Sequence, residues 1–329
     1  MRTPEFWDGV TVGSKLTAMA LAPLGWAYSA TVAFKAANAK PYRSSAKVIC
    51  VGNLTAGGTG KTPIVIAIAR ALMERRLPVY ILTRGYGGRV RGPTIVTSQM
   101  DASEAGDEAL LLAAATPVII SPDRAAGAKL AEANSADVIV MDDGHQNFSL
   151  AKDLSIVVID SDRGFGNGRM LPAGPLREPV QQGLARADAI ILTGEGNFTP
   201  PKFTGPVLRA RLVPTEGFEL KGRRVLAFAG IGQPEKFFRT LRNLGAEIAS
   251  AHAFPDHHVY RSHEMAQLRE KSGAKNAMLI TTEKDFVRLP PLQRQDVQYL
   301  SVRATFDNPN ALSALLDGIV QPTGGGLSD

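Results

Sequence analysis

Apolar residues in this chain fall into two kinds of segment. Short, nearly continuous apolar runs alternate with longer segments in which apolar residues recur every three or four positions. The short runs predict β-strands and the longer segments predict α-helices. Because the runs lack the alternation of a half-exposed sheet, we expect a mostly parallel sheet covered on both faces. Predicted strands cover residues 48–51, 79–83, 117–120, 137–141, 154–159 and 189–192, and predicted helices cover 63–76, 104–115, 122–134 and 180–187.

The pattern changes at residues 196–222, where short polar and Pro-rich pieces predict a connector that could contain two extended strands. A second, smaller α/β unit follows. Its predicted strands cover 225–229, 248–253 and 277–281, and its predicted helices cover 234–244 and 262–271. The sequence therefore predicts an N-terminal helical segment (1–40), a core domain (41–195), the connector (196–222), a C-terminal α/β domain (223–320) and a disordered tail (321–329).

The segment 16–34 contains nineteen residues without a charge. That length nominally reaches a membrane-spanning helix, but Pro23 and Gly25 lie in its middle. We expect an interfacial helix pair, broken near Pro23, that associates with a membrane surface. Its apolar side chains would face lipid, namely Leu21, Leu24, Trp26, Tyr28, Val32 and Phe34. The alternatives are a helix packed on the protein body and a signal peptide ending at 37–39, although acidic residues occupy the region that should be basic.

The first predicted strand runs into a glycine-rich loop that ends in Gly-Lys-Thr and is followed by a predicted helix. Glycines let backbone N–H groups approach an anion, and the helix directs its positive end at the same place. Lys61 would reach the β- and γ-phosphates and the Thr62 hydroxyl would ligate Mg²⁺. The usual first glycine is replaced by Thr55, so a chance glycine turn is the alternative. The expected nucleotide-binding residues are Thr55, Ala56, Gly57, Gly58, Thr59, Gly60, Lys61 and Thr62.

The composition excludes some classes of protein. The 329 residues are 44% hydrophobic, which suits one large or two modest α/β domains. A single cysteine, Cys50, excludes a disulfide within the chain and fits a reducing compartment. The net charge of +6 favours acidic partners, which are nucleic acid, anionic lipid or phosphorylated substrates. Basic residues flanking the apolar segment favour a membrane surface, and no zinc spacing or helix-turn-helix pattern supports nucleic acid. These basic residues are Lys15, Lys35, Lys40, Arg43 and Lys47.

Two acidic pairs stand near predicted element ends. Asp142 and Asp143 follow a buried strand, where carboxylates beside a phosphate loop hold Mg²⁺, although a loop-capping pair is the alternative. Asp107 and Glu108 open a predicted helix and by themselves are ordinary partners of the helix dipole.

Three further motifs stand in loops or at predicted helix starts. His257-His258 could supply a general acid or base, or be exposed loop histidines. Arg177, next to Glu178 in the Pro-rich loop 171–179, could clamp a phosphate. The run 281–285 could be a helix start alone.

Taken together and in order, these motifs resemble the tetraacyldisaccharide 4′-kinase family, the lipid A 4′-kinases of Gram-negative bacteria. The resemblance spans roughly residues 5–290. It is carried by the sequences at 51–63, Arg84-Gly85-Tyr86-Gly87-Gly88, Gly106-Asp107-Glu108, Asp142-Asp143-Gly144-His145-Gln146, 163–169, 171–179, Asp256-His257-His258 and Thr282-Glu283-Lys284-Asp285.

The resemblance implies a P-loop NTPase-like domain with a smaller α/β domain, acting at the cytoplasmic face of the inner membrane. It implies ATP, Mg²⁺ and transfer of the γ-phosphoryl group to the 4′-hydroxyl of an acylated glucosamine disaccharide 1-phosphate. No nucleic acid and no obligate protein partner are expected. It also implies roles for site residues: Asp107 as base with help from His257, Lys61 on the phosphates, Glu108, Asp142 and Asp143 near Mg²⁺, and Arg84, Arg177 and Glu178 in active-site loops.

Two positions depart from the family pattern. His145 stands where Phe is more common, and Asn147 stands where His is common, so a role for a histidine at position 147 does not transfer to this chain. The alternatives to the lipid kinase are a membrane-bound switch ATPase of the partitioning type and a nucleic-acid-binding protein. Partitioning ATPases often carry Lys where this chain has Ala56. The kinase hypothesis further requires that the phosphate loop and His257 meet across the two domains, which would close before reaction.

Overall fold

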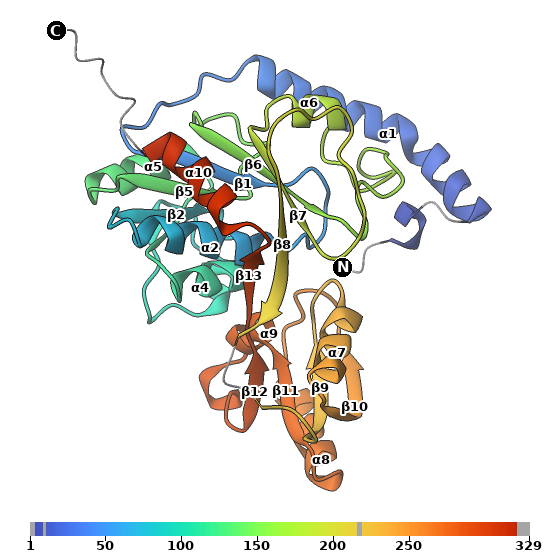
Figure 1. The fold of residues 1–329 in the computed structure, drawn as a ribbon. Helices are drawn as coiled ribbons and strands as arrows, with labels where there is room; N and C mark the ends of the chain where they lie inside the picture. Colours follow the sequence, from blue (N-terminus) through green and yellow to red (C-terminus); the bar gives the residue numbers. More distant parts are fainter. Residues whose placement is uncertain (1–3, 9–10, 216–218, 321–329) are drawn as a thin grey trace, which may run out of the picture.

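The computed structural model describes residues 4–8, 11–215 and 219–320. The chain forms a large unit and a small unit, which Figure 1 shows one above the other. A nine-stranded sheet forms the centre of the large unit, in the order β13-β8-β7-β6-β1-β5-β2-β4-β3. Its strands are parallel except at the edges, where β13 and β3 are antiparallel to their neighbours. The strands are β1 (Lys47–Gly52), β2 (Val79–Thr83), β3 (Thr94–Ile95), β4 (Val118–Ile120), β5 (Val138–Asp142), β6 (Leu154–Asp160), β7 (Ala189–Thr193), β8 (Val207–Pro214) and β13 (Val302–Phe306).

Helices cover both faces of this sheet, as the continuous apolar strands predict. Ile64 and Ile68 of α2 and Leu112 of α4 fill the core on one face, and Ala128 and Ala131 of α5 fill the core on the other. The predicted helix over 104–115 is interrupted at Gly106, whose φ of 87° suits glycine and separates two short helices. The helices of the large unit are α2 (Lys61–Met73), α3 (Ala102–Ala105), α4 (Asp107–Ala113), α5 (Arg124–Ala133), α6 (Val180–Leu184) and α10 (Pro309–Val320).

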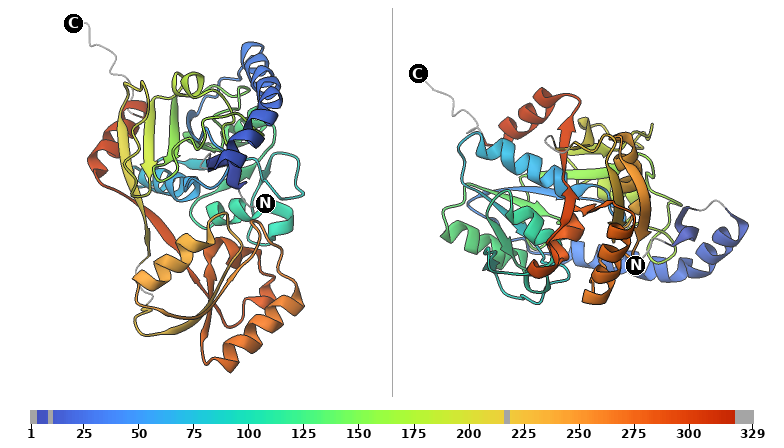
Figure 2. Two further views of the ribbon diagram at one scale, coloured as in Figure 1. Left: turned by 90° about the vertical axis from the view of Figure 1, so that its right-hand side faces the viewer. Right: turned by 90° about the horizontal axis from the view of Figure 1, so that it is seen from below.

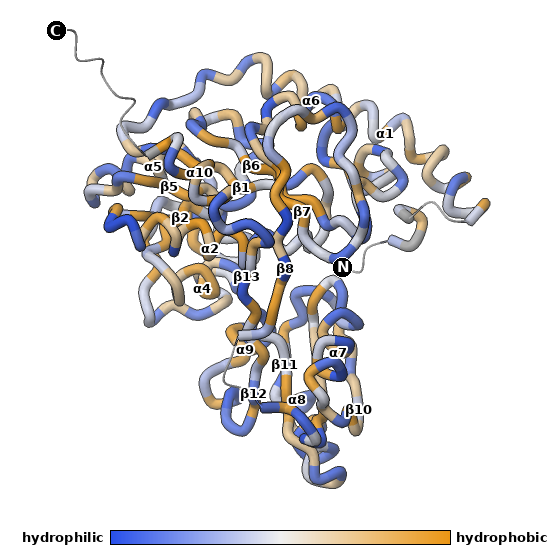
Figure 3. Tube along the Cα trace, viewed as in Figure 1, coloured by the Kyte–Doolittle hydropathy of each residue, from blue (hydrophilic) through white to orange (hydrophobic). Residues whose placement is uncertain are grey.

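The small unit is a four-stranded parallel sheet in the order β10-β9-β11-β12. Phe237 and Phe238 of α7 pack on one face, and Met265 and Leu268 of α8 pack on the other. In Figure 3 the most hydrophobic segments of both units are the inner strands. The elements are β9 (Arg224–Ala229), β10 (Glu247–Ala253), β11 (Met278–Thr282), β12 (Val297–Leu300), α7 (Pro234–Asn243), α8 (Ser262–Ala274), α9 (Glu283–Arg288) and the 3₁₀ helix η2 (Pro291–Gln293).

The chain crosses between the units twice, and this differs from the predicted domain boundaries. The predicted connector 196–222 contains β8, which is a full member of the large sheet. The predicted C-terminal domain 223–320 loses its last part, because β13 pairs with β8 and α10 packs on the large core through Leu312 and Leu316. The two crossings lie side by side, with Thr215 N donating to Ser301 O at 3.0 Å. The predicted tail 321–329 lies outside the described residues.

The N-terminal segment forms one helix, α1 (Val12–Ala37), along the outside of the large unit, preceded by the 3₁₀ helix η1 (Glu5–Asp8) (Figure 2). The predicted break is wrong, since Pro23 lies inside a continuous helix. Gly25 sits against the loop at Met170, where a Cβ would come within 3.2 Å. Large apolar side chains remain exposed, with Trp26 and Phe34 each 71% accessible. Within the described residues this is the one helix long and apolar enough to span a membrane.

Candidate functional site

The glycine loop lies between β1 and α2, as predicted. Gly57 and Gly60 have φ of 111° and 76°, which favour glycine and turn the chain into the start of α2. Lys61 is the first residue of that helix, and its Nζ lies 3.0 Å from both Asn53 Oδ1 and Asp143 Oδ1. Two acceptors therefore hold the Lys61 ammonium over the loop.

The other predicted nucleotide-binding residues of the loop differ in their contacts and in their exposure. The Ala56 N–H donates to Pro175 O at 2.7 Å, and Thr55 forms a bridge with Leu176. These contacts fasten the start of the loop to the Pro-rich segment. Gly57 and Gly58 are exposed, and Thr62 lies half-buried in the first turn of α2. The open part of the loop is therefore at Gly57 and Gly58, since Thr59 is buried, and the N–H groups and dipole at the start of α2 just beyond favour an anion.

Asp142 ends β5, which pairs directly with β1, and Asp143 follows it and contacts Lys61, so both lie next to the loop. Burial alone would raise the pKa of Asp143, but Lys61 and Arg177 outweigh it and hold that pKa well below its usual range. Arg177 donates to both Asp143 oxygens at 2.9 and 3.0 Å. Burial, together with the negative charges of Glu108 and Asp143, raises the pKa of Asp142 to about 7. The carboxyl groups of Asp142, Asp143 and Glu108 thus lie close enough for their charges to repel one another.

This charge distribution fits a divalent cation held jointly by protein and phosphate oxygens. Among the described residues, no group of three or more His, Cys, Asp or Glu side chains is arranged to hold a metal ion. Mg²⁺ in nucleotide sites commonly uses one or two carboxylates, with phosphates and water completing its octahedron. Asp142, whose carboxylate is buried and accepts from Thr83 Oγ1 at 3.1 Å, is in a position to supply such a ligand.

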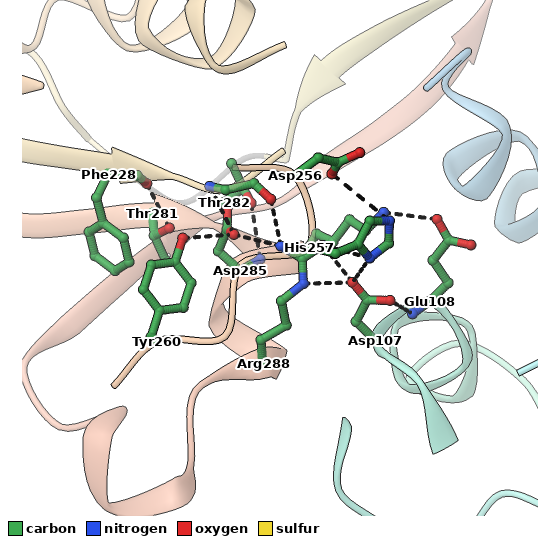
Figure 4. A network of polar contacts seen from close by, with 12 residues as sticks. Asp107, Glu108, Phe228, Asp256, His257, Tyr260, Thr281, Thr282, Asp285 and Arg288 are labelled. Atoms are coloured by element: carbon green, nitrogen blue, oxygen red, sulfur yellow. Dashed lines mark hydrogen bonds and ion pairs between the residues drawn. The ribbon is translucent and has the colours of Figure 1, made fainter. Parts of the chain in front are cut away.

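The two units meet at Asp107 and His257, which are 150 positions apart in the sequence (Figure 4). Asp107 is the first residue of α4 in the large unit, and its Oδ2 lies 3.1 Å from His257 Nδ1 in the small unit. Burial alone would raise the pKa of Asp107, but the His257 hydrogen bond and the charges of Lys284 and Arg288 hold that pKa well below its usual range. Asp107 is therefore an anion with three basic partners.

A second pair of contacts at this junction comes from α9. Lys284 donates to Glu108 Oε1 at 2.8 Å, and Arg288 Nε donates to Asp107 Oδ2 at 2.6 Å. Arg288 is absent from the sequence-based set. The signal that could have found it is its spacing, three residues after Asp285 and four after Lys284, which places all three on one side of a short helix.

The remaining predicted residues occupy different surroundings. Arg84 is exposed just after β2. Glu178 is 1% exposed and accepts from Gln146 Nε2 at 2.7 Å and from Arg186, so its contacts are those of a buried support for the loop. His258 pairs with Glu264 at 3.0 Å and stacks on Phe254.

His145 and Asn147, the two positions that depart from the family pattern, each have hydrogen-bond partners within the large unit. His145 is fully buried, with its Nε2 2.9 Å from Gly183 O and its Nδ1 3.1 Å from Ser155 Oγ. Burial lowers the pKa of His145 to about 4, so the ring is neutral at pH 7. Asn147 Oδ1 accepts from Ser149 N at 3.1 Å within its own turn. Neither contact set involves the phosphate loop.

A strand–glycine loop–helix with Lys61 and Thr62, flanked by acidic strand ends, defines a P-loop NTPase-like protein of the phosphoryl-transfer class. The comparison with known proteins identifies the family within this class. The tetraacyldisaccharide-1-P 4′-kinase family model matches residues 17–321, and the chain belongs to this family. It is a kinase of lipid A biosynthesis.

Individual relatives agree. The chain is 49% identical over 325 residues to the tetraacyldisaccharide 4′-kinase of Paramagnetospirillum magneticum, covering 97% of this chain and 99% of the relative. It is 47% identical over 329 residues to that of Rhodospirillum rubrum, covering 97% and 98%. Among solved structures it is similar to LpxK from Aquifex aeolicus in complex with ATP, with a TM-score of 0.76, 30% identity and coverage of 92% of this chain and 99% of that one.

Proposed function

We propose that this kinase transfers the γ-phosphoryl group of ATP to the 4′-hydroxyl of tetraacyldisaccharide 1-phosphate. The names of the relatives and the ATP complex of the Aquifex aeolicus structure support the substrates. The observation that carries the proposal is the Asp107–His257 contact, because it holds a candidate proton acceptor of the large unit, which also contains the phosphate loop, against a histidine of the small unit.

The phosphate loop supplies the nucleotide site. The amides of Gly58, Thr59 and Gly60, with the Lys61 ammonium, would surround the β- and γ-phosphates. Lys61 would exchange its contact with Asp143 for phosphate oxygens, since both are anions. Thr62 and Asp142, with Asp143 or Glu108 nearby, would hold Mg²⁺, which when bound neutralises charge on the transferring group.

Asp107 and His257 would handle the proton of the acceptor. The sugar hydroxyl oxygen forms a bond to the γ-phosphorus as the bond between that phosphorus and the ADP oxygen breaks. The hydroxyl proton passes to the Asp107 carboxylate. His257, which lies within hydrogen-bond distance of Oδ2 of that carboxylate, holds it in place. Because the pair spans two units, the transfer is competent only when these units are closed on each other.

The exposed face of α1 supports peripheral contact with the cytoplasmic face of the inner membrane. An acylated acceptor stays in the bilayer, so its kinase has to work at that surface. Leu16, Leu24, Trp26 and Phe34 are each more than half exposed, and Lys15 and Lys35 border the apolar stretch where headgroup phosphates would lie.

The direct test is a mass spectrum of the lipid product. Purified protein with ATP, Mg²⁺ and tetraacyldisaccharide 1-phosphate should produce a lipid heavier by one phosphoryl group, and fragmentation should place that group on the distal sugar. ATP hydrolysis with no phosphorylated lipid would contradict the proposal and favour the switch-ATPase alternative.

A further inference from the structure

Arg288 of α9 places a nearly buried guanidinium between the two units. Its side chain is 6% exposed. Its Nε donates to Asp107 Oδ2 at 2.6 Å, and one terminal nitrogen donates to Asp285 Oδ1 at 2.8 Å and to Gly230 O at 2.7 Å. A buried cation is tolerated only when it is paired and its donors find acceptors. The contacts of Arg288 meet that requirement from both units at once (Figure 4).

Asp285 anchors this guanidinium within the small unit. It is fully buried and accepts hydrogen bonds from Gly230 N at 3.0 Å, Tyr260 Oη at 2.9 Å and Thr282 Oγ1 at 2.6 Å. Thr282 also caps α9 through the Asp285 N–H. Satisfied buried networks of this kind are rigid. The plane of the Arg288 guanidinium is therefore set by the core of the small unit.

The same guanidinium also contacts the surroundings of His257. The Gly230 carbonyl that accepts from Arg288 also accepts from the His257 N–H at 3.1 Å. His257 has a φ of 58°, a conformation that a non-glycine residue keeps only when its surroundings hold it. A terminal nitrogen of Arg288 lies 3.4 Å from His257 Nδ1, next to the 3.1 Å contact between Nδ1 and Asp107 Oδ2.

We infer that Arg288, anchored by Asp285, is a positioning residue for phosphoryl transfer. It fixes the carboxylate of Asp107 relative to the imidazole of His257 and acts through these two side chains. This inference rests on the proposed function. The planar, forked guanidinium suits the task, because a lysine ammonium could not hold Asp107, Asp285 and the Gly230 carbonyl in fixed directions.

Steady-state kinetics of Arg288 variants tests the inference. Arg288→Ala should lower kcat about 100-fold while the KM for ATP stays within about threefold, as expected when a reacting group is displaced by about 1 Å. Methylguanidinium added to the Arg288→Ala variant should raise its kcat roughly tenfold, because it fills the space that the side chain left. Arg288→Lys should retain part of the wild-type activity. The matched control is Arg294→Ala, which removes an arginine that donates to the carbonyls of Val287 and Leu289 at the end of α9 and lies over the Phe286 ring, and it should leave kcat unchanged.

A double-mutant cycle separates positioning from general structure. In the Asp107→Ala background, adding Arg288→Ala should lower kcat by less than about a further threefold, because the carboxylate that Arg288 orients is already absent. A further loss of 100-fold there, unchanged kcat in the single variant, or a rise in kcat would each overturn the inference. If Arg288→Ala does not fold, the same cycle with Arg288→Lys decides. Wild-type protein that makes no phosphorylated lipid would instead refute the proposed function, independently of Arg288.

Discussion

Lys284 of the small unit donates to Glu108 of the large unit at 2.8 Å, one residue along from the contact of His257 with Asp107. The consecutive carboxylates at the start of α4 are therefore both held by basic side chains of the other unit. On a second side, Lys236 of α7 reaches Asp160 and Asp162 at 3.1 and 2.9 Å. These contacts between the units are charged, and the partly exposed pairs of Lys236 and Lys284 can be replaced by water and ligands.

Replacing Lys61 should remove the cation that meets the phosphates. We expect Lys61→Ala to lower kcat by about two orders of magnitude or more, because transfer depends on neutralising charge at the phosphoryl group. The measurement is phosphorylated lipid formed per minute at saturating ATP. Lys47→Ala is the matched control, since Lys47 pairs at 3.5 Å with Asp153 at the opposite end of β1. Equal losses in the two variants would argue against a phosphate role for Lys61.

Asp107→Asn should keep the shape of the side chain and remove its charge. We expect a loss in kcat of about 100-fold or more, with ATP binding retained, because an amide cannot accept the hydroxyl proton. Calorimetric titration with ATP and product analysis measure the two effects separately. Asp101→Asn, which alters a surface helix cap, is the control. Retention of more than a tenth of the activity would show that another group takes the proton.

The exposed face of α1 should carry membrane binding. Replacing both Trp26 and Phe34 by Ser should weaken binding to vesicles of anionic phospholipid by about 100-fold, since each large apolar side chain contributes roughly 1.5–3 kcal/mol when buried. Co-sedimentation with vesicles measures the change. Leu292→Ser is the control, because Leu292 is 83% exposed but lies in the small unit. Unchanged sedimentation of the double variant would remove α1 from the membrane-binding surface.

Acid should destabilise the large unit through His145. In the unfolded chain this imidazole titrates near its usual pKa of 6.5, whereas burial lowers it to about 4 in the folded protein. As the pH falls through 6.5 the unfolded state binds a proton that the folded state does not, so stability is lost. Between pH 7 and pH 5 this amounts to roughly 2 kcal/mol, complete only below the folded pKa.

Urea unfolding at several pH values measures this dependence. The variant His145→Phe cannot titrate and should lose less stability over that range, even if its stability at pH 7 is lower because Ser155 and Gly183 lose a partner. A pH slope as steep as that of the wild-type protein would assign the effect to other groups.

The amino-acid sequence alone determined the elements whose signals are local. The strands that begin near residues 79, 154 and 189 and the helix that begins at Lys61 lie where apolar periodicity predicts them, within a few residues. The glycine loop was equally clear, because its conformation depends on the glycines themselves. The acidic strand end at Asp142 followed from parallel strands ending at one edge.

Long-range pairing decided the rest. No local signal distinguishes β13 from a strand of the small unit, because membership depends on whether β8 leaves an edge free to accept it. The local sequence likewise did not predict that α1 continues through Pro23, and only the structure shows Gly25 of this helix against Met170. The positions of Asp107, His257 and Arg288 relative to one another arise only when two separate cores dock. The pattern of apolar residues determines the structure of a few neighbouring residues. An ion pair between the two units depends instead on how both units fold and where they lie relative to each other.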